Sequence, residues 1–145
     1  MKITIEQIQP DQLEELLIRC HDPNSPWAAR VMAAASPEVT VTGYIEDAAY
    51  CLPIRELYYF EVVDGKSFAY AEKTVYECRL RLYEFEKLVE GHRFFRCSKS
   101  MVLNASRIDH IKPSFSGRFT ATLRNGEKVD ISRQYVGEMR KQLGL

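Results

Sequence analysis

Apolar residues recur at every second position through much of the chain after residue 38, and this pattern indicates strands. Gly, Asp and Pro separate the alternating stretches, which are short and rich in β-branched and aromatic residues. The predicted strands cover residues 39–44, 48–52, 57–63, 67–72 and 75–78. Strands of this length and spacing predict a mainly β fold of antiparallel sheets with short helices.

The segment Tyr58–Tyr70 predicts a hairpin with two possible registers. A two-residue turn at Asp64-Gly65 places Phe60 opposite Ala69. A loop one residue longer at its start places Phe60 opposite Phe68 and the two end tyrosines opposite each other. Because the longer loop gathers four aromatic side chains on one face, we expect that register.

A second hairpin is predicted over residues 118–132. A tight turn at Asn125-Gly126 pairs Leu123 with Lys128, whereas a three-residue loop that starts at Arg124 aligns the apolar positions of the two strands. We expect the three-residue loop. Its facing pairs are Phe119 with Ile131, Ala121 with Val129 and Leu123 with Glu127.

Apolar residues at helical spacing predict helices over residues 81–89 and 133–143. Gly91 follows the first of them, and Ser132 is expected to cap the start of the second. Between them, Ile108 and Ile111 indicate a single helical turn within residues 104–111, capped by Asn or Ser.

Residues 1–42 form a small N-terminal α+β segment in this interpretation, and residues 43–145 form the main domain. Residues 2–9 are expected to be a strand that turns at Pro10; residues 13–20 fit either a helix or a second strand, and we favour the strand. A helix is expected over 27–35, with its end at Ser36-Pro37. So short a segment buries little surface, and Trp27, Val31 and Met32 need a partner. We therefore expect it to dimerise or to dock a partner.

Arg93–Asn104 sets basic side chains among aromatic and aliphatic ones in a strand-like stretch. That mixture suits a surface that faces a polyanion, although a buried strand with solvated basic neighbours has the same composition.

The zero net charge of the chain conceals a strong asymmetry. Residues 92–145 hold eleven Lys and Arg against four Asp and Glu, a net charge of +7, and residues 1–91 hold nine against sixteen, a net charge of −7. A basic half joined to an acidic half favours nucleic acid over a membrane as the partner.

Catalytic and metal chemistry find little support in the sequence. Cys20, Cys51, Cys78 and Cys97 have no paired spacing and no nearby paired His, so we expect four buried free thiols and no metal or other cofactor. His110 is expected at the surface. The charged N-terminus has no signal-peptide pattern, and we expect a cytoplasmic, non-enzymatic protein.

Four motifs together resemble the LytTR-type DNA-binding domain of bacterial transcription regulators. They are FFRCSKSMVLN at Phe94–Asn104, Ile108-x-x-Ile111, Asn125-Gly126-Glu127 and ISRQY at Ile131–Tyr135. The resemblance covers residues 43–145. It implies antiparallel sheets whose loops enter successive major grooves, bend the duplex and bind imperfect direct repeats in promoters. Residues 1–42 are too short for the phosphate-accepting receiver domain of many members, and resemble members restrained by a small membrane protein.

The resemblance also implies which residues read bases. Lys66-Ser67 matches the first base-reading loop of the family, Lys99 matches the second and Arg133 matches the third. Many members have His-Arg-Ser or His-Asn-Ser where this chain has Ser98–Ser100, so the resemblance does not fix the base preference at that contact.

The remaining polar residues near these loops are expected to hold phosphates. They are Arg96, Ser98, Ser100, Arg107, Lys112 and Arg118.

The resulting hypothesis is a dimeric, sequence-specific regulator that binds double-stranded DNA. The alternative is a β-rich ligand-sensing or protein-interaction module that does not read DNA.

Overall fold

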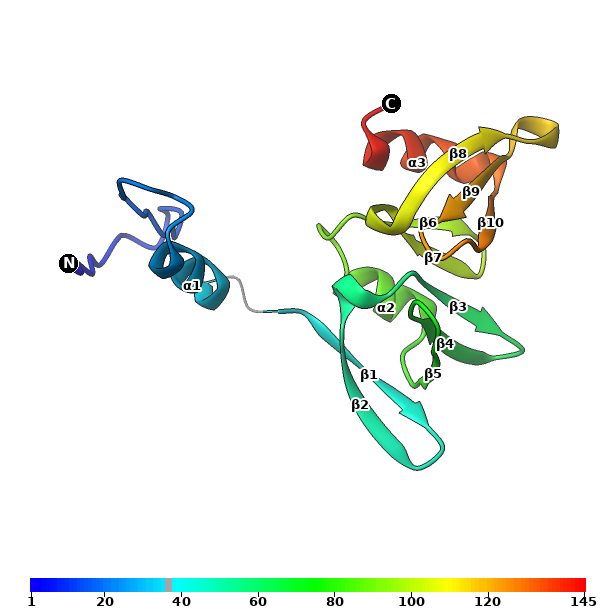
Figure 1. The fold of residues 1–145 in the computed structure, drawn as a ribbon, viewed down its shortest axis with the longest axis horizontal. Coiled ribbons are helices and arrows are strands. Elements are labelled where there is room, and N and C mark those ends of the chain that lie inside the picture. The colour runs from blue at the N-terminus through cyan, green and yellow to red at the C-terminus, as the bar shows by residue number, and fades with distance from the viewer. Residues whose placement is uncertain (36–37) are drawn as a thin grey trace. The chain divides into compact units, whose positions relative to one another are not determined.

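The computed structural model describes residues 1–35 and 38–145 and divides the chain into two compact units, Met1–Glu38 and Val39–Leu145 (Figure 1). The first unit contains the helix α1 (Pro26–Ala35), which confirms the helix predicted over 27–35. The predicted helix end at Ser36-Pro37 lies outside the described residues.

The strands predicted within residues 1–20 do not form in this described part of the chain. The turn near Pro10 is confirmed, because the Gln12 N–H donates to the Gln9 carbonyl oxygen at 3.0 Å, but the segments on either side stay unpaired. Ile5 is 93% exposed and Leu17 is 68% exposed, so the two segments have no apolar layer to pack against. A two-stranded ribbon without such a layer is marginal in water, which explains why the prediction is wrong.

Unit Val39–Leu145, all of which is described, contains two antiparallel sheets, and its mainly β fold confirms the predicted fold class. The larger sheet has the strand order β2-β1-β5-β4-β3-β7-β6, and the smaller has the order β10-β9-β8. The strands are β1 (Thr40–Ile45), β2 (Ala48–Pro53), β3 (Tyr59–Val63), β4 (Lys66–Tyr70), β5 (Val75–Cys78), β6 (Phe94–Ser98), β7 (Met101–Asn104), β8 (Ile108–Pro113), β9 (Phe119–Leu123) and β10 (Lys128–Ile131). The helices are α2 (Leu82–Leu88) and α3 (Val136–Leu143), with 3-10 turns η1 (Ile54–Glu56), η2 (Ala105–Arg107), η3 (Phe115–Gly117) and η4 (Arg133–Tyr135).

The expected register of the first hairpin is wrong. Asp64 (φ 50°) and Gly65 (φ 77°) form a two-residue turn, and Phe60 pairs with Ala69. The prediction assumed one apolar face, but β3 is buried on both faces: Tyr59 packs between the two sheets, and Phe60 stacks on Phe85 of α2 with ring centroids 4.1 Å apart.

The second hairpin has the expected three-residue loop, since Ala121 pairs with Val129 and the Leu123 N–H donates to the Glu127 carbonyl oxygen at 2.8 Å. The helix predicted over 81–89 is confirmed as α2. The helix predicted over 133–143 is confirmed as η4 followed by α3. The Ser132 side chain makes no capping hydrogen bond. The backbone carbonyl oxygen of Ser132 instead accepts from the Tyr135 N–H at 2.9 Å, which forms the turn η4.

Two central predictions need correction. Arg93–Asn104 forms two strands, β6 and β7, joined by a tight turn at Lys99-Ser100. The helical turn expected within 104–111 is η2, where the Asn104 side chain accepts from the Ser106 N–H at 3.0 Å. Ile108 and Ile111 belong to β8, because the small sheet offers them strand partners.

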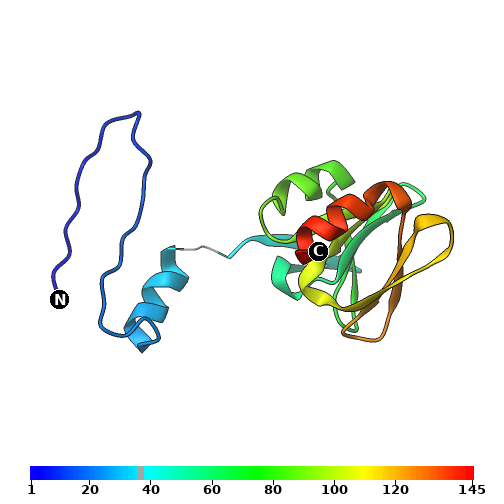
Figure 2. The same cartoon turned by 90° about the horizontal axis from the view of Figure 1, so that it is seen from above.

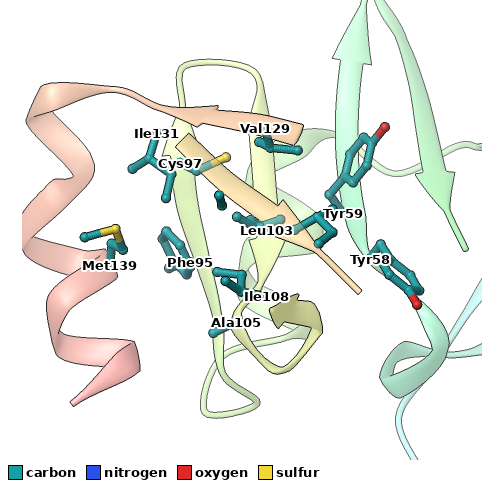
Figure 3. Close-up of a cluster of buried hydrophobic side chains, with 12 residues drawn as sticks. Tyr58, Tyr59, Phe95, Cys97, Leu103, Ala105, Ile108, Val129, Ile131 and Met139 are labelled. Atoms are coloured by element: carbon teal, nitrogen blue, oxygen red, sulfur yellow. The ribbon is translucent and has the colours of Figure 1, made fainter. Parts of the chain in front are cut away.

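Two apolar cores hold this unit together. The first lies between the sheets and under α3, where Met139 of α3 faces Phe95 of β6 (Figure 3). The second lies between the larger sheet and α2. Figure 2 shows α2 in green and α3 in red; they cover opposite faces of the larger sheet, and residues of both helices line a groove along the edge strand β6.

Candidate DNA interface

Four connections of unit Val39–Leu145 lie at one end of its two sheets. The Val62 N–H, beside the β3–β4 turn, donates to the Ser100 carbonyl oxygen of the β6–β7 turn at 2.9 Å. The Ser132 N–H, at the end of β10, donates to the Cys97 carbonyl oxygen of β6 at 2.9 Å. Because Ile131 pairs with Phe119, the β8–β9 loop also lies at this end. We call residues 64–67, 98–100, 112–118 and 132–134 the basic end.

The first groove of the basic end lies between the β3–β4 and β6–β7 turns. It has a volume of about 460 Å³, and its lining includes Gly65, Ser67, Arg81, Lys99 and Ser100. Lys66 and Lys99 are exposed, as base-reading side chains require. Ser67 is only 8% exposed, so the structure does not support the expectation that its side chain reads a base.

The second groove of the basic end lies beside η3 and η4. It has a volume of about 340 Å³ and is lined by Ser116, Arg118, Ser132, Arg133 and Gln134. Both arginines are exposed. Lys112 is exposed on β8 next to the same loop, where it pairs with Thr120. The two grooves together offer four exposed cations, Arg81, Lys99, Arg118 and Arg133, to an extended anion, and Lys66 is exposed in the turn beside the first groove.

Arg96 is not free to hold a phosphate in this structure, contrary to expectation. Its guanidinium is half-buried and ion-paired with Glu86 of α2, to which Nε donates at 3.1 Å. A second nitrogen donates to the Lys99 carbonyl oxygen at 3.1 Å. Arg96 therefore ties α2 to the turn that carries Lys99.

Ser98 and Ser100 also shape this turn. The Ser98 hydroxyl oxygen accepts from the Ser100 N–H at 3.3 Å, a local bond that stabilises the reversal of the chain. Both serines are half-buried, so each has part of its surface open to a phosphate.

Arg107 lies at the opposite end of the sheets and does not join the predicted phosphate contacts. Its Nε and a terminal nitrogen donate to the Arg55 carbonyl oxygen at 3.1 and 2.6 Å, and its guanidinium carbon lies 5.2 Å from the ring centroid of Tyr58. The Arg124 N–H donates to the Arg107 carbonyl oxygen at 2.9 Å. These contacts fix the joint between the two sheets.

Two residues in or next to the candidate interface, Arg81 and Glu86, were not identified from the sequence. Arg81 lies just before α2, where an arginine is electrostatically unfavourable next to free backbone N–H groups. Its unfavourable position could have indicated from the sequence that Arg81 has a role in binding. Glu86 is ten residues from its partner Arg96, on another element, and only the fold brings the two together.

The cysteines and histidine offer no reactive centre at the basic end. Burial raises the pKa of the Cys97 thiol to about 12 and that of Cys78 to about 11, so both thiols stay protonated. Cys51 is exposed and Cys20 is half-buried, so the expectation of four buried thiols is wrong for these two. His110 is at the surface as expected. Among the described residues, no cluster of His, Cys, Asp or Glu could hold a metal ion.

Glu86→Gln removes the charge of the Glu86–Arg96 ion pair and keeps its size. If Glu86 positions the Lys99 turn, specific DNA binding should weaken about fivefold, equivalent to about 1 kcal/mol. The measurement is a gel-shift titration with specific and random duplexes. Glu90→Gln, the same charge change at an exposed position just beyond the end of α2, is the matched control. Tighter specific binding by Glu86→Gln would show that Glu86 only repels DNA.

Comparison with known proteins shows the family of this chain. The model of the LytTr DNA-binding domain matches residues 47–144. The chain belongs to the LytTR family. The resemblance deduced from the motifs is thereby confirmed.

Individual relatives agree with the LytTR assignment. The chain is 30% identical over 100 residues to the sensory transduction protein LytT of Enterococcus faecalis, covering 69% of this chain and 41% of that protein. It is 27% identical over 127 residues to the transcriptional regulatory protein YpdB of Escherichia coli, covering 82% of this chain and 52% of that protein. The chain thus spans about half the length of these relatives or less.

A solved structure shows the same LytTR fold. It is the LytTr DNA-binding domain of a putative methyl-accepting/DNA response regulator from Bacillus cereus, with a TM-score of 0.70 and 31% identity. The match covers 75% of this chain and all of that one. Among the described residues of the present chain, none of the helices has the length and apolar character needed to cross a membrane.

Proposed function

We propose that this protein is a non-enzymatic, cytoplasmic transcription regulator whose LytTR domain binds double-stranded DNA in a sequence-specific manner. One observation carries the proposal: the three segments that resemble the base-reading loops of the family lie at the same end of the two sheets. Backbone hydrogen bonds between those segments hold them there. An interface fixed in this way presents its side chains to successive contacts on one duplex.

Lys66, Lys99 and Arg133 are the proposed base readers, since Lys and Arg donate to guanine O6 and N7 in the major groove. Arg81, Lys112 and Arg118 are the proposed phosphate contacts, because they are exposed around the same grooves. Ser98 and Ser100 add hydroxyl groups at the Lys99 turn. The proposed operator consists of imperfect direct repeats in a promoter, which the protein bends.

Selection from a pool of random duplexes tests this function. The full chain should enrich a common sequence motif, and the same motif should appear in a footprint upstream of its own gene. Specific affinity should exceed the affinity for random DNA by about a thousandfold or more at physiological salt. Enrichment of no motif, with equal affinity for all duplexes, would contradict the proposal.

We also propose that the N-terminal unit is a docking segment that joins two copies. Its apolar side chains are largely exposed: Ile3, Ile5, Leu13, Leu16 and Met32 are 80%, 93%, 87%, 65% and 56% exposed. Apolar surface of this extent in one short segment is typical of a binding site. A small membrane protein is the second proposed partner, because the exposed apolar side chains of the segment suit an apolar surface.

Removal of residues 1–38 should therefore convert a dimer into a monomer. The remaining LytTR domain has both cores intact, so the truncated protein should still bind a single half-site and occupy the full site less well. Light scattering of both proteins, beside gel-shift titrations of half-site and full-site duplexes, measures this. A full-length monomer, or a truncated protein that stays dimeric, would contradict this role of the segment.

A further inference from the structure

Phe115 is an exception among the phenylalanines of this chain. It is 89% exposed, whereas the other six are buried or half-buried. It stands in η3, the loop between β8 and β9 at the basic end. None of the motifs that resemble the LytTR family includes it.

The loop holds Phe115 outward in a defined conformation. The Ser114 N–H donates to the Arg118 carbonyl oxygen at 2.8 Å, and the Arg118 N–H donates to the Phe115 carbonyl oxygen at 3.1 Å. Ser116 (φ 58°) and Gly117 (φ 74°) both adopt the left-handed conformation, which closes the reversal. The phenyl ring is therefore presented by a closed loop.

Cations surround the base of this loop. Arg118 and Arg133 line one groove together with Ser116, and Lys112 is exposed on the strand that leads into the loop. The Arg133 side chain lies against Gly117: a Cβ atom on residue 117 would be 3.0 Å from the Arg133 Cδ. Phe115 thus projects beside a proposed base reader, between side chains suited to flanking phosphates.

We propose that Phe115 is an apolar wedge that inserts between two base pairs and kinks the duplex. This inference rests on the proposed DNA binding and adds a contact to it. An inserted Phe partly unstacks one base step, and flanking cations compensate the phosphates that the bend brings together. The bend that results lets more of the basic end reach DNA. The wedge would favour sites with a pyrimidine–purine step at the point of insertion, because such steps unstack most readily.

Three variants of the full chain test the wedge: Phe115→Ala, Phe115→Leu and, as a matched control, Tyr50→Ala. Tyr50 is a half-exposed aromatic residue on β2, at the opposite edge of the larger sheet from β6. The duplex is the motif that the parent protein selects from a random pool. Circular-permutation gel shifts measure the bend, and 2-aminopurine placed at successive positions reports unstacking.

The parent protein should bend the site and raise 2-aminopurine fluorescence at one base step. Phe115→Ala should lose that signal and most of the bend, and bind about tenfold more weakly, whereas Phe115→Leu should keep most of all three. Tyr50→Ala should behave as the parent does. Because the ring is exposed, the thermal midpoint of Phe115→Ala should not change.

A straight duplex in the parent complex, or a bend and fluorescence signal that Phe115→Ala leaves unchanged, would overturn the wedge. In both of those cases the parent still binds its motif, and the proposed sequence-specific binding stands, although a straight duplex would also remove the proposed bend. Failure of the parent to select any motif would instead overturn the proposed function, and the wedge with it.

Discussion

Replacement of both Lys99 and Arg133 with alanine is expected to abolish sequence-specific binding while the protein stays folded. Each cation that donates to a base edge contributes about 1–3 kcal/mol of discrimination. The two side chains line different grooves of the basic end, so their effects should add. A combined loss of about 4 kcal/mol would lower specific affinity about a thousandfold, to the level of random DNA.

The control for this double variant is Lys128→Ala. Lys128 is an exposed cation at the start of β10, whereas Arg133 follows the other end of that strand. Its removal changes the net charge without touching the basic end, so specific affinity should stay close to that of the parent. Gel-shift titrations on specific and random duplexes give both affinities. A footprint that survives the double replacement would show that these two residues do not read the site.

Asn104→Ala is expected to destabilise the LytTR domain by about 2–4 kcal/mol. Asn104 is 2% exposed, its Nδ2 donates to the Leu57 carbonyl oxygen at 2.8 Å, and its Oδ1 accepts from the Ser106 N–H. Alanine would leave the Leu57 carbonyl oxygen and the Ser106 N–H without these bonds. The bond to Leu57 is buried, so water cannot readily replace it. Urea denaturation followed by circular dichroism measures the change in the free energy of unfolding.

Asn125→Ala is the matched control, because Asn125 makes the same kinds of bond in a solvent-accessible loop. Its Nδ2 donates to the Glu72 carbonyl oxygen at 3.1 Å, and its Oδ1 accepts from the Glu127 N–H at 3.1 Å. Water can replace these partners, so the loss should stay below about 1 kcal/mol. Equal losses for the two variants would show that burial of Asn104 is not what makes it important.

The two hairpins show what local sequence could predict. In the second hairpin, the three-residue loop at Arg124 aligns the apolar positions of both strands. Because the small sheet has one buried face, the alternation of apolar and polar residues was sufficient to predict the register. In the first, β3 is covered on one face by the small sheet and on the other by α2. A strand buried on both faces has no polar face to fix its register, so the pattern favoured the wrong loop.

The candidate site was predictable where a residue's exposure follows from its place in a turn. Lys66, Lys99 and Arg133 stand in or next to turns and are exposed, as the motifs implied. Arg96 and Arg107 are basic residues with the same local appearance, yet tertiary contacts with Glu86 and with the Arg55 carbonyl oxygen engage them. Partners so distant in sequence leave no local pattern.

Chemical-shift mapping by NMR tests the central claim most directly, namely that DNA binds at the basic end. The ¹⁵N-labelled full chain would be titrated with its selected duplex and, separately, with random DNA. The account predicts that the selected duplex shifts the amides of residues 64–67, 98–100, 112–118 and 132–134. Shifts confined to residues 105–107 and 124–126, at the opposite end of the sheets, would contradict it.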